Sequence, residues 1–190
     1  MNITVYGAAS NNIDQSYIDN GVKLGREIAK RGHTVVNGGG ATGLMGAVSR
    51  GAHQEGGYVI GISPTFFLEV DGALYQGSDE MIYTDTMRER KQLLEDKADA
   101  FIMTPGGIGT FEEFFEILTL KQLGRHHKPI VIFNDNGYYD HMLGMLEHTI
   151  HEGFMKENNR ELYHFSDNVD DILAYLENYD VKDNKNYRSI

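Results

Sequence analysis

A glycine-rich turn between an apolar run and an amphipathic run constrains the fold of this chain more than any other feature. Residues 100–103 are apolar, residues 104–110 contain three glycines, and an amphipathic run follows over 111–123. This order is typical of a buried strand, a tight turn and a helix. Turns of small residues also follow the apolar runs that end at Tyr6 and Val36. We therefore expect at least three strand–turn–helix units.

Apolar and amphipathic segments alternate along the whole chain. The expected strands are 3–6, 33–36, 58–62, 80–83, 100–103 and 128–133. The expected helices are 14–31, 44–55, 86–97, 111–123, 138–152 and 169–179. Several strands are continuous apolar runs, which is typical of an α/β fold with a parallel sheet flanked by helices on both faces. A length of 190 residues suits one such domain. We expect the single domain to cover 1–180, with a polar C-terminal tail over 181–190.

The composition excludes several classes of protein. The formal net charge of −11 argues against a partner that is a nucleic-acid polymer or an anionic membrane surface. The chain contains no cysteine, which excludes disulfides, thiolate metal sites and a cysteine nucleophile. No signal peptide is visible, and no apolar run is long enough to span a membrane. We expect a cytoplasmic protein.

The three small-residue turns are expected to meet at one edge of the sheet. In an open parallel sheet, ligands bind in the crevice at the carboxyl ends of the strands. The turn over 104–110 also precedes a helix N-terminus, which offers unpaired N–H groups and the positive end of a dipole. Glycine backbone lets an anion approach these groups closely. The sequence therefore predicts that this turn binds a phosphate.

Residues 38–43 have the G-x-G-x-x-G spacing of dinucleotide-binding turns. That class of site also needs an acidic residue about 20 positions later, whereas the next strand leads into Ser63 and Pro64. The turn also follows the second strand rather than the first. A tight turn that only lets a helix pack closely would explain the same glycines. We favour a third interpretation, in which this turn forms one wall of a mononucleotide pocket.

Thr110 and Glu113 have the T-x-x-E spacing of a capping box, in which Thr110 is the N-cap and Glu113 accepts a hydrogen bond from its N–H. A capping box does not need the preceding glycines, so a second role is open. A carboxylate near a helix N-terminus is stabilised in its ionised form. Such a group can accept hydrogen bonds from ribose hydroxyls. It can also stabilise positive charge at a sugar carbon as a glycosidic bond breaks.

Two groups of titratable residues have competing interpretations. Arg88, Arg90 and Lys91 form a cationic cluster in this acidic chain. They either occupy a solvated helix face or contact a phosphate or a leaving group over the edge of the sheet. The eight histidines lack a motif such as H-E-x-x-H. We interpret them as surface or packing residues and expect no metal site.

Residues 105–113 read P-G-G-I-G-T-F-E-E, which resembles the P-G-G-x-G-T-x-x-E signature of the LOG (LONELY GUY) family. The resemblance extends from about Val5 to Leu176. Shorter matches support it at 38–40, 43–46, 87, 90–91, 119, 122–124, 128–129, 137–139 and 152–154. It implies a Rossmann-like enzyme that hydrolyses the N-glycosidic bond of a nucleoside 5′-monophosphate, either AMP or an N6-substituted adenine (cytokinin) riboside monophosphate. The products would be a free base and ribose 5-phosphate. The family also implies a homodimer and no metal or organic cofactor.

The resemblance implies roles for individual residues as well. Arg90 and Glu113 match the catalytic positions. The matching substrate-binding positions are Ser10, Gly39, Gly40, Gly43, Met45, Met87, Lys91, Pro105, Gly106, Gly107, Ile108, Gly109, Thr110, Phe111, Glu112 and Thr119. Family members are often labelled lysine decarboxylases, but no lysine in this sequence has a recognisable setting for pyridoxal phosphate.

The chain departs from the family pattern in places that concern the base. Ala8 lies in the first turn where the family usually has serine, Arg88 replaces a common histidine, and Leu120 replaces a common tryptophan. The 64–80 loop fits the family poorly, and Glu69 is its candidate base-contacting acid. These differences leave the base undetermined. The alternative function is a non-catalytic nucleotide sensor or carrier, which would need the glycine turns but not Arg90 together with Glu113.

Overall fold

The computed structural model describes residues 1–180, and the tail predicted over 181–190 lies outside the described residues. The strands are β1 (Asn2–Tyr6), β2 (Thr34–Asn37), β3 (Val59–Pro64), β4 (Glu80–Thr84), β5 (Ala100–Met103), β6 (Ile130–Phe133) and β7 (His164–Ser166). The α-helices are α1 (Gln15–Lys30), α2 (Gly43–Gln54), α3 (Met87–Lys97), α4 (Ile108–Gln122), α5 (Asp140–His151) and α6 (Val169–Glu177). Three short 3-10 helices are η1 (Thr65–Glu69), η2 (Asp135–Gly137) and η3 (Glu157–Leu162).

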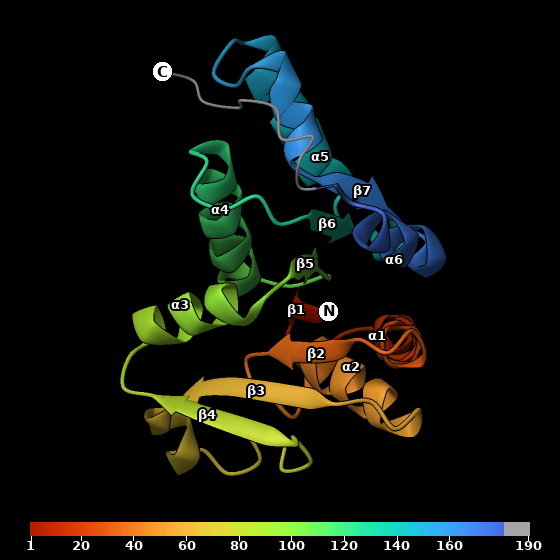
Figure 1. The fold of residues 1–190 in the computed structure, drawn as a ribbon, viewed down its shortest axis with the longest axis vertical. Coiled ribbons are helices and arrows are strands. Elements are labelled where there is room, and N and C mark those ends of the chain that lie inside the picture. The colour runs from red at the N-terminus through yellow and green to blue at the C-terminus, as the bar shows by residue number, and fades with distance from the viewer. Residues whose placement is uncertain (181–190) are drawn as a thin grey trace.

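The strands form one seven-stranded parallel sheet in the order β4-β3-β2-β1-β5-β6-β7 (Figure 1). The first strand, β1, therefore lies inside the sheet, with β2 on one side and β5 on the other. Strands β2 to β4 extend the sheet in one direction and β5 to β7 in the other. This reversal is the topological switch point at which open α/β sheets bind ligands. The predicted α/β fold class is confirmed.

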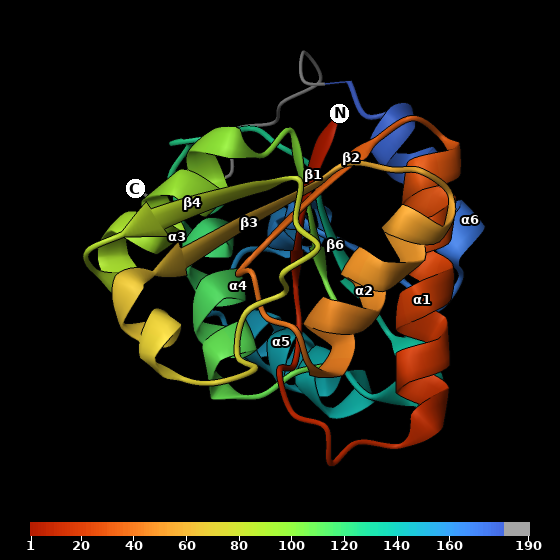
Figure 2. The same cartoon turned by 90° about the horizontal axis from the view of Figure 1, so that it is seen from below.

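Two apolar layers cover the two faces of the sheet. Alternate strand residues point to opposite faces, so Phe101 packs in one layer and Ile102 in the other. Helices α3, α4 and α5 supply side chains to the layer around Phe101. Helices α1, α2 and α6 supply side chains to the layer around Ile102. Figure 2 shows α1, α2 and α6 on one side of the sheet and α3 and α4 on the other. No helix among residues 1–180 is long and apolar enough to cross a membrane.

The structure adds three features that the sequence analysis did not predict. β7 is a half-buried three-residue edge strand that pairs only with β6, and it has no apolar run that would have indicated a strand. β3 continues through Ser63 and Pro64, which pair with Tyr83 and Thr84 of β4. η1 occupies part of the 64–80 loop. β3 is completely buried in the parallel sheet. Local sequence patterns do not predict its pairing with β4, because the paired residues are far apart in the chain.

The last turn of α4 contains a buried charge. Lys121 is 1% exposed, and its Nζ has no hydrogen-bond partner among the described residues. The Nζ lies 5.0 Å from the centroid of the Tyr179 ring, which provides a cation–π contact. Burial lowers the pKa of the Lys121 amine to about 8. A lysine near a helix C-terminus interacts favourably with the helix dipole. Lys121 is nevertheless largely desolvated, which disfavours its charged form.

We expect Lys121→Met to raise the free energy of unfolding at pH 7 by roughly 1–3 kcal/mol, because it removes a buried charge and keeps an apolar stem. The folded protein releases the Lys121 proton near pH 8, whereas the unfolded chain keeps it until about pH 10.4. Between these values the unfolded wild type binds more protons, so its stability rises with pH and the difference from the variant shrinks. Urea unfolding of both proteins across this range measures the effect. A stability difference independent of pH would contradict it.

Candidate active site

The three small-residue turns meet at the carboxyl edge of the sheet, as the sequence analysis predicted. The first and third turns line a cavity of about 370 Å³ together with Met45 of α2, η1 and the first turns of α3 and α4. The cavity lies where β1 separates β2 from β5, at the switch point of the sheet. Its lining residues are Gly7, Ala8, Ala9, Ser10, Met45, Phe67, Met87, Arg90, Gly107, Gly109, Thr110, Glu112 and Glu113.

The glycine turn leads from β5 into α4 earlier than predicted. Gly107 is the N-cap, so the prediction that Thr110 caps this helix was wrong. Thr110 lies in the first turn of α4 and is 4% exposed. It packs closely against Gly106, since a Cβ at Gly106 would lie 2.1 Å from Thr110 Oγ1. The N–H groups of Ile108, Gly109 and Thr110 are consequently the unpaired donors at the start of the helix. These are the donors that an anion would use at this turn, and the predicted phosphate site stays a prediction.

Arg90 and Glu113 form a buried ion pair beside that helix start. Arg90 Nη1 donates a hydrogen bond of 2.7 Å to Glu113 Oε1, and Arg90 Nε donates one of 3.2 Å to the Ile62 carbonyl. Arg90 is 7% exposed and Glu113 is 9% exposed. A Cβ at Gly38 would lie 2.0 Å from Arg90 Nη2, so any side chain at this turn residue would displace the guanidinium from its present position. Glu113 therefore pairs with Arg90 rather than closing a capping box.

The electrostatic setting of Glu113 has two opposing parts. Burial raises the pKa of the Glu113 carboxyl above the ordinary glutamate value, while the Arg90 guanidinium and its hydrogen bond lower it. The carboxylate thus stands at a cavity wall with one oxygen held by Arg90. A positive charge that develops inside the cavity would face this carboxylate. The buried surroundings screen charge weakly, so the attraction between the two would be strong.

Two tyrosines from the η2–α5 corner hold the backbone of the glycine turn. Tyr138 Oη donates a hydrogen bond of 2.8 Å to the Gly106 carbonyl. Tyr139 Oη donates one of 2.8 Å to the Thr104 carbonyl and is itself 1% exposed. On the opposite side, the Ala8 N–H donates to the Pro105 carbonyl at 3.1 Å. These contacts fix the turn from both sides, so its N–H groups are held in place before an anion binds.

Comparison with known proteins places the chain in a family. A family model described as "Possible lysine decarboxylase" matches residues 45–176. The chain is 38% identical over 179 residues to the cytokinin riboside 5′-monophosphate phosphoribohydrolase LOG of Oryza sativa subsp. japonica, covering 93% of the chain and 73% of that protein. It is 39% identical over 153 residues to the enzyme of the same description from Rhodococcoides fascians, covering 80% and 77%. The chain belongs to the LOG family.

The fold of this LOG-family member is also found in a protein of a different kind. The Moco carrier protein from Chlamydomonas reinhardtii has a TM-score of 0.69 at 22% identity, covering 93% of this chain and 94% of that one. At this level of identity the likeness concerns the fold alone.

The decarboxylase label of the family model implies pyridoxal phosphate, and the residues at the cavity do not fit that group. A lysine that forms a Schiff base needs a depressed pKa and a free amine. Lys91 is the lysine beside Arg90, and its Nζ contacts the carboxylates of Glu112 and Glu116. These partners raise the pKa of Lys91, which keeps it protonated. Within residues 1–180, no group of three His, Asp or Glu side chains could hold a metal ion either.

The structure brings together about half of the residues that the LOG resemblance assigned to substrate. Ser10, Met45, Met87, Gly107, Gly109, Thr110 and Glu112 line the cavity with the Arg90–Glu113 pair. Gly39, Gly40 and Gly43 form the turn behind Met45, and Pro105 and Gly106 border an adjacent cavity of about 150 Å³. Ile108 is 87% exposed. Phe111 packs against the core and Thr119 is exposed farther along α4, so neither lines the cavity. Their roles stay predictions.

Sequence reasoning missed Phe67, which reaches the cavity from η1. The only sequence feature that could have indicated Phe67 as a site residue was its position in the 64–80 loop. No sequence motif identifies a single aromatic residue in an irregular segment. Glu69, the candidate base-contacting acid of that loop, is exposed and does not line the cavity. Backbone bonds from the Ala41 N–H to the Ala73 carbonyl and from the Tyr75 N–H to the Gly39 carbonyl hold the loop beside the second glycine turn.

Arg90→Met should leave Glu113 buried without its partner. We expect the free energy of unfolding to fall by roughly 3 kcal/mol, because an uncompensated buried charge is costly. Adding Glu113→Leu removes both charges and should restore most of the loss. Urea unfolding of the wild type, the single variant and the double variant measures both effects. A double variant as unstable as the single one would attribute the loss to packing instead.

Proposed function

We propose that this LOG-family chain hydrolyses the N-glycosidic bond of a nucleoside 5′-monophosphate, giving a free base and ribose 5-phosphate. The single observation that carries the proposal is the buried Arg90–Glu113 pair beside an exposed glycine turn at a helix N-terminus. The curated relatives reported above are phosphoribohydrolases that act on cytokinin riboside 5′-monophosphates. The same reaction class is the one that this site geometry supports best.

The proposed mechanism assigns phosphate binding to the N–H groups at the start of α4 and charge stabilisation to the Glu113 carboxylate. The N–H groups of Ile108, Gly109 and Thr110 bind the 5′-phosphate, which fixes the sugar. Glu113 then faces the ribose and stabilises the positive charge that develops at C1′ as the bond to the base breaks. Water adds to C1′, and the base leaves with a proton. Arg90 holds Glu113 in position and lies close enough to the cavity to assist the departing base.

Apolar side chains define the part of the cavity that remains for the base. Met45, Met87 and Phe67 line it from three different elements. Thioether and aromatic groups suit a purine and an apolar substituent on it. We therefore propose that AMP and N6-substituted adenine riboside monophosphates are the substrates to compare first.

The assembly and location of the enzyme belong to the same proposal. Phe66, Leu68 and Val70 of the η1 segment and Ile108 of α4 are exposed apolar residues close to the cavity. Exposed apolar groups of this kind are typical of subunit contacts, and we propose a homodimer. The cytoplasmic location expected from the sequence stays a prediction.

Glu113→Gln should preserve the shape of the pair and remove the charge. We expect kcat to fall by roughly 100-fold or more, because stabilisation of the developing positive charge is lost. HPLC of AMP and isopentenyladenosine monophosphate after incubation with each protein measures the release of base. Glu152→Gln is the matched control, since Glu152 is exposed at the end of α5 and distant in sequence from the site.

Two outcomes would change this proposal. Undiminished turnover by Glu113→Gln would remove the catalytic role of that carboxylate. If the wild type binds these monophosphates tightly and releases no base from any of them, the chain is a nucleotide sensor or carrier instead.

The pH dependence of kcat/KM provides an independent test of Glu113. Protonation removes the negative charge, so activity should fall as the pH drops through the pKa of this carboxyl. Burial raises that pKa, so the acid limb should lie above the ordinary glutamate value of about 4.3. A pH profile measured at low substrate concentration reports the free enzyme. An acid limb at or below the ordinary value would assign the ionisation to another group.

A further inference from the structure

Residues 65–79 connect β3 to β4 without an α-helix and supply one wall of the cavity at the carboxyl edge of the sheet. The segment begins with η1, and Phe67 of η1 lines the cavity. Residues 65–70 are all exposed, so they pack weakly against the rest of the molecule. Contacts farther along the segment therefore determine where Phe67 lies.

A series of backbone hydrogen bonds connects Phe67 to the second glycine turn. The Val70 N–H donates to the Phe67 carbonyl at 3.2 Å, and the Ala73 N–H donates to the Val70 carbonyl at 3.1 Å. The Ala73 carbonyl in turn accepts a hydrogen bond of 2.9 Å from the Ala41 N–H of the glycine turn. A displacement of Ala73 would be transmitted to Phe67 through these contacts.

His53, Tyr75 and Asp79 form a cluster of side chains, the His53 cluster, at the far end of this segment. His53 Nε2 donates a hydrogen bond of 3.0 Å to Asp79 Oδ2, because a carboxylate can only accept. In the neutral ring, His53 Nδ1 then accepts the hydrogen bond of 2.9 Å from Tyr75 Oη. The two rings stack with centroids 5.5 Å apart. Asp79 Oδ2 also accepts a hydrogen bond of 2.8 Å from the Val59 N–H of β3.

Tyr75 is held at both its backbone and its side chain. Its N–H donates to the Gly39 carbonyl at 2.8 Å, while its hydroxyl reaches His53 in the last turn of α2. A Cβ at Gly77 would lie 2.9 Å from Tyr75 Cζ, so the segment also folds closely over the ring. The first turn of α2 contains Met45, which lines the cavity. The His53 cluster thus holds residues 73–75 against the glycine turn from which α2 begins.

Different contacts hold the Arg90–Glu113 pair. Arg90 donates to Glu113 Oε1 and to the Ile62 carbonyl of β3. In the described part of the chain, no hydrogen bond or ion pair joins either side chain to residues 65–79. Loosening the 65–79 segment should therefore move Phe67 and leave the ion pair in place.

We propose that His53 and Tyr75 are positioning residues, which hold Phe67 against the base of a bound nucleoside 5′-monophosphate. This inference rests on the proposed function, because that function assigns Phe67 to the part of the cavity that takes the base. The contact with the base exists before and during bond breaking. Its loss should raise KM with little change in kcat.

A double-mutant cycle in the full-length chain tests whether His53 acts through Phe67. His53→Leu and Phe67→Ala should each raise KM for AMP roughly fivefold or more, with kcat within about twofold of the wild type. The double variant should have the KM of Phe67→Ala alone, because the contact that His53 holds in place is already gone. Tyr75→Phe keeps the ring and loses the hydroxyl, so it should raise KM less than His53→Leu. Multiplicative KM effects in the double variant, or a fall in kcat as large as the rise in KM, would overturn the proposal.

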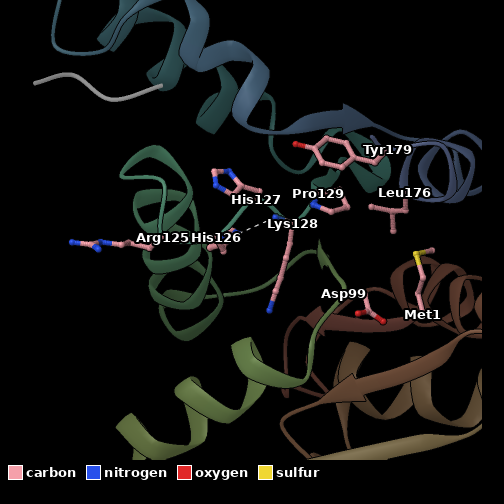
Figure 3. Close-up of a pocket in the computed structure, with 9 residues that line it drawn as sticks. All are labelled: Met1, Asp99, Arg125, His126, His127, Lys128, Pro129, Leu176 and Tyr179. Carbon is pink, nitrogen blue, oxygen red and sulfur yellow. Dashed lines mark hydrogen bonds between the residues drawn. The ribbon is translucent and has the colours of Figure 1, made fainter. Parts of the chain in front are cut away.

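Two other histidines provide controls. His164 of β7 donates to Asp171 Oδ2 at 2.7 Å and stacks on Tyr175 with centroids 4.3 Å apart, so His164→Leu breaks a similar set of contacts away from the cavity. His127 is exposed and lines a cavity of about 780 Å³ at the amino edge of the sheet (Figure 3). His164→Leu and His127→Leu should leave KM unchanged. An equal rise of KM in either control would attribute the effect to a general loss of stability and overturn the proposal.

Hydrogen exchange tests the positioning role without turnover. In His53→Leu, the amides of 65–75 should exchange roughly tenfold faster or more than in the wild type, and those of 106–113 should be unchanged. If the wild type releases base from no monophosphate, the proposed function fails, and the same cycle measured on the Kd of AMP by calorimetry decides the role of His53. Unchanged exchange at 65–75 would overturn the positioning role whatever the activity.

Discussion

The buried ion pair between Arg90 and Glu113 is the interaction on which the rest of the site depends. Each partner comes from a different helix, and the guanidinium also reaches the Ile62 carbonyl of β3. Burying two charges is favourable only when geometry and hydrogen bonds are both satisfied. The pair therefore requires α3, α4, β3 and the Gly38 turn to be in register, which explains why the sequence has glycine where the guanidinium passes.

Local sequence patterns predicted most of the helices and strands. They did not predict the side-chain contacts between these elements. Apolar runs and glycine turns predicted the buried strands because parallel strands are covered on both faces. The half-buried β7 lacks that signal. Two T-x-x-E patterns show the limit most clearly: Thr86 and Glu89 form a capping box, whereas Thr110 and Glu113 do not. An extended Gly107 begins α4 three residues earlier than predicted, and Arg90, 23 residues away in sequence, becomes the partner of Glu113.

Helix α4 runs from the carboxyl edge of the sheet to the opposite edge. Its first turn borders the glycine loop beside Arg90, and its last turn contains Lys121 at the opposite edge of the sheet. The helix dipole has opposite effects at these ends, since it favours an anion at the start and a cation at the finish.

The central position of β1 has a consequence for how the molecule forms. Residues 2–6 pair with β2 soon after them in the chain, but their other partner, β5, is about a hundred residues away. Pairing over such a separation closes a long loop before its contacts are gained, which makes folding slow. The first turn and the glycine turn come together at the carboxyl-edge cavity only after this late step, because they follow β1 and β5. A growing chain released before Thr104 emerges would contain two of the three turns and neither the N–H donors of residues 108–110 nor the Glu113 carboxylate.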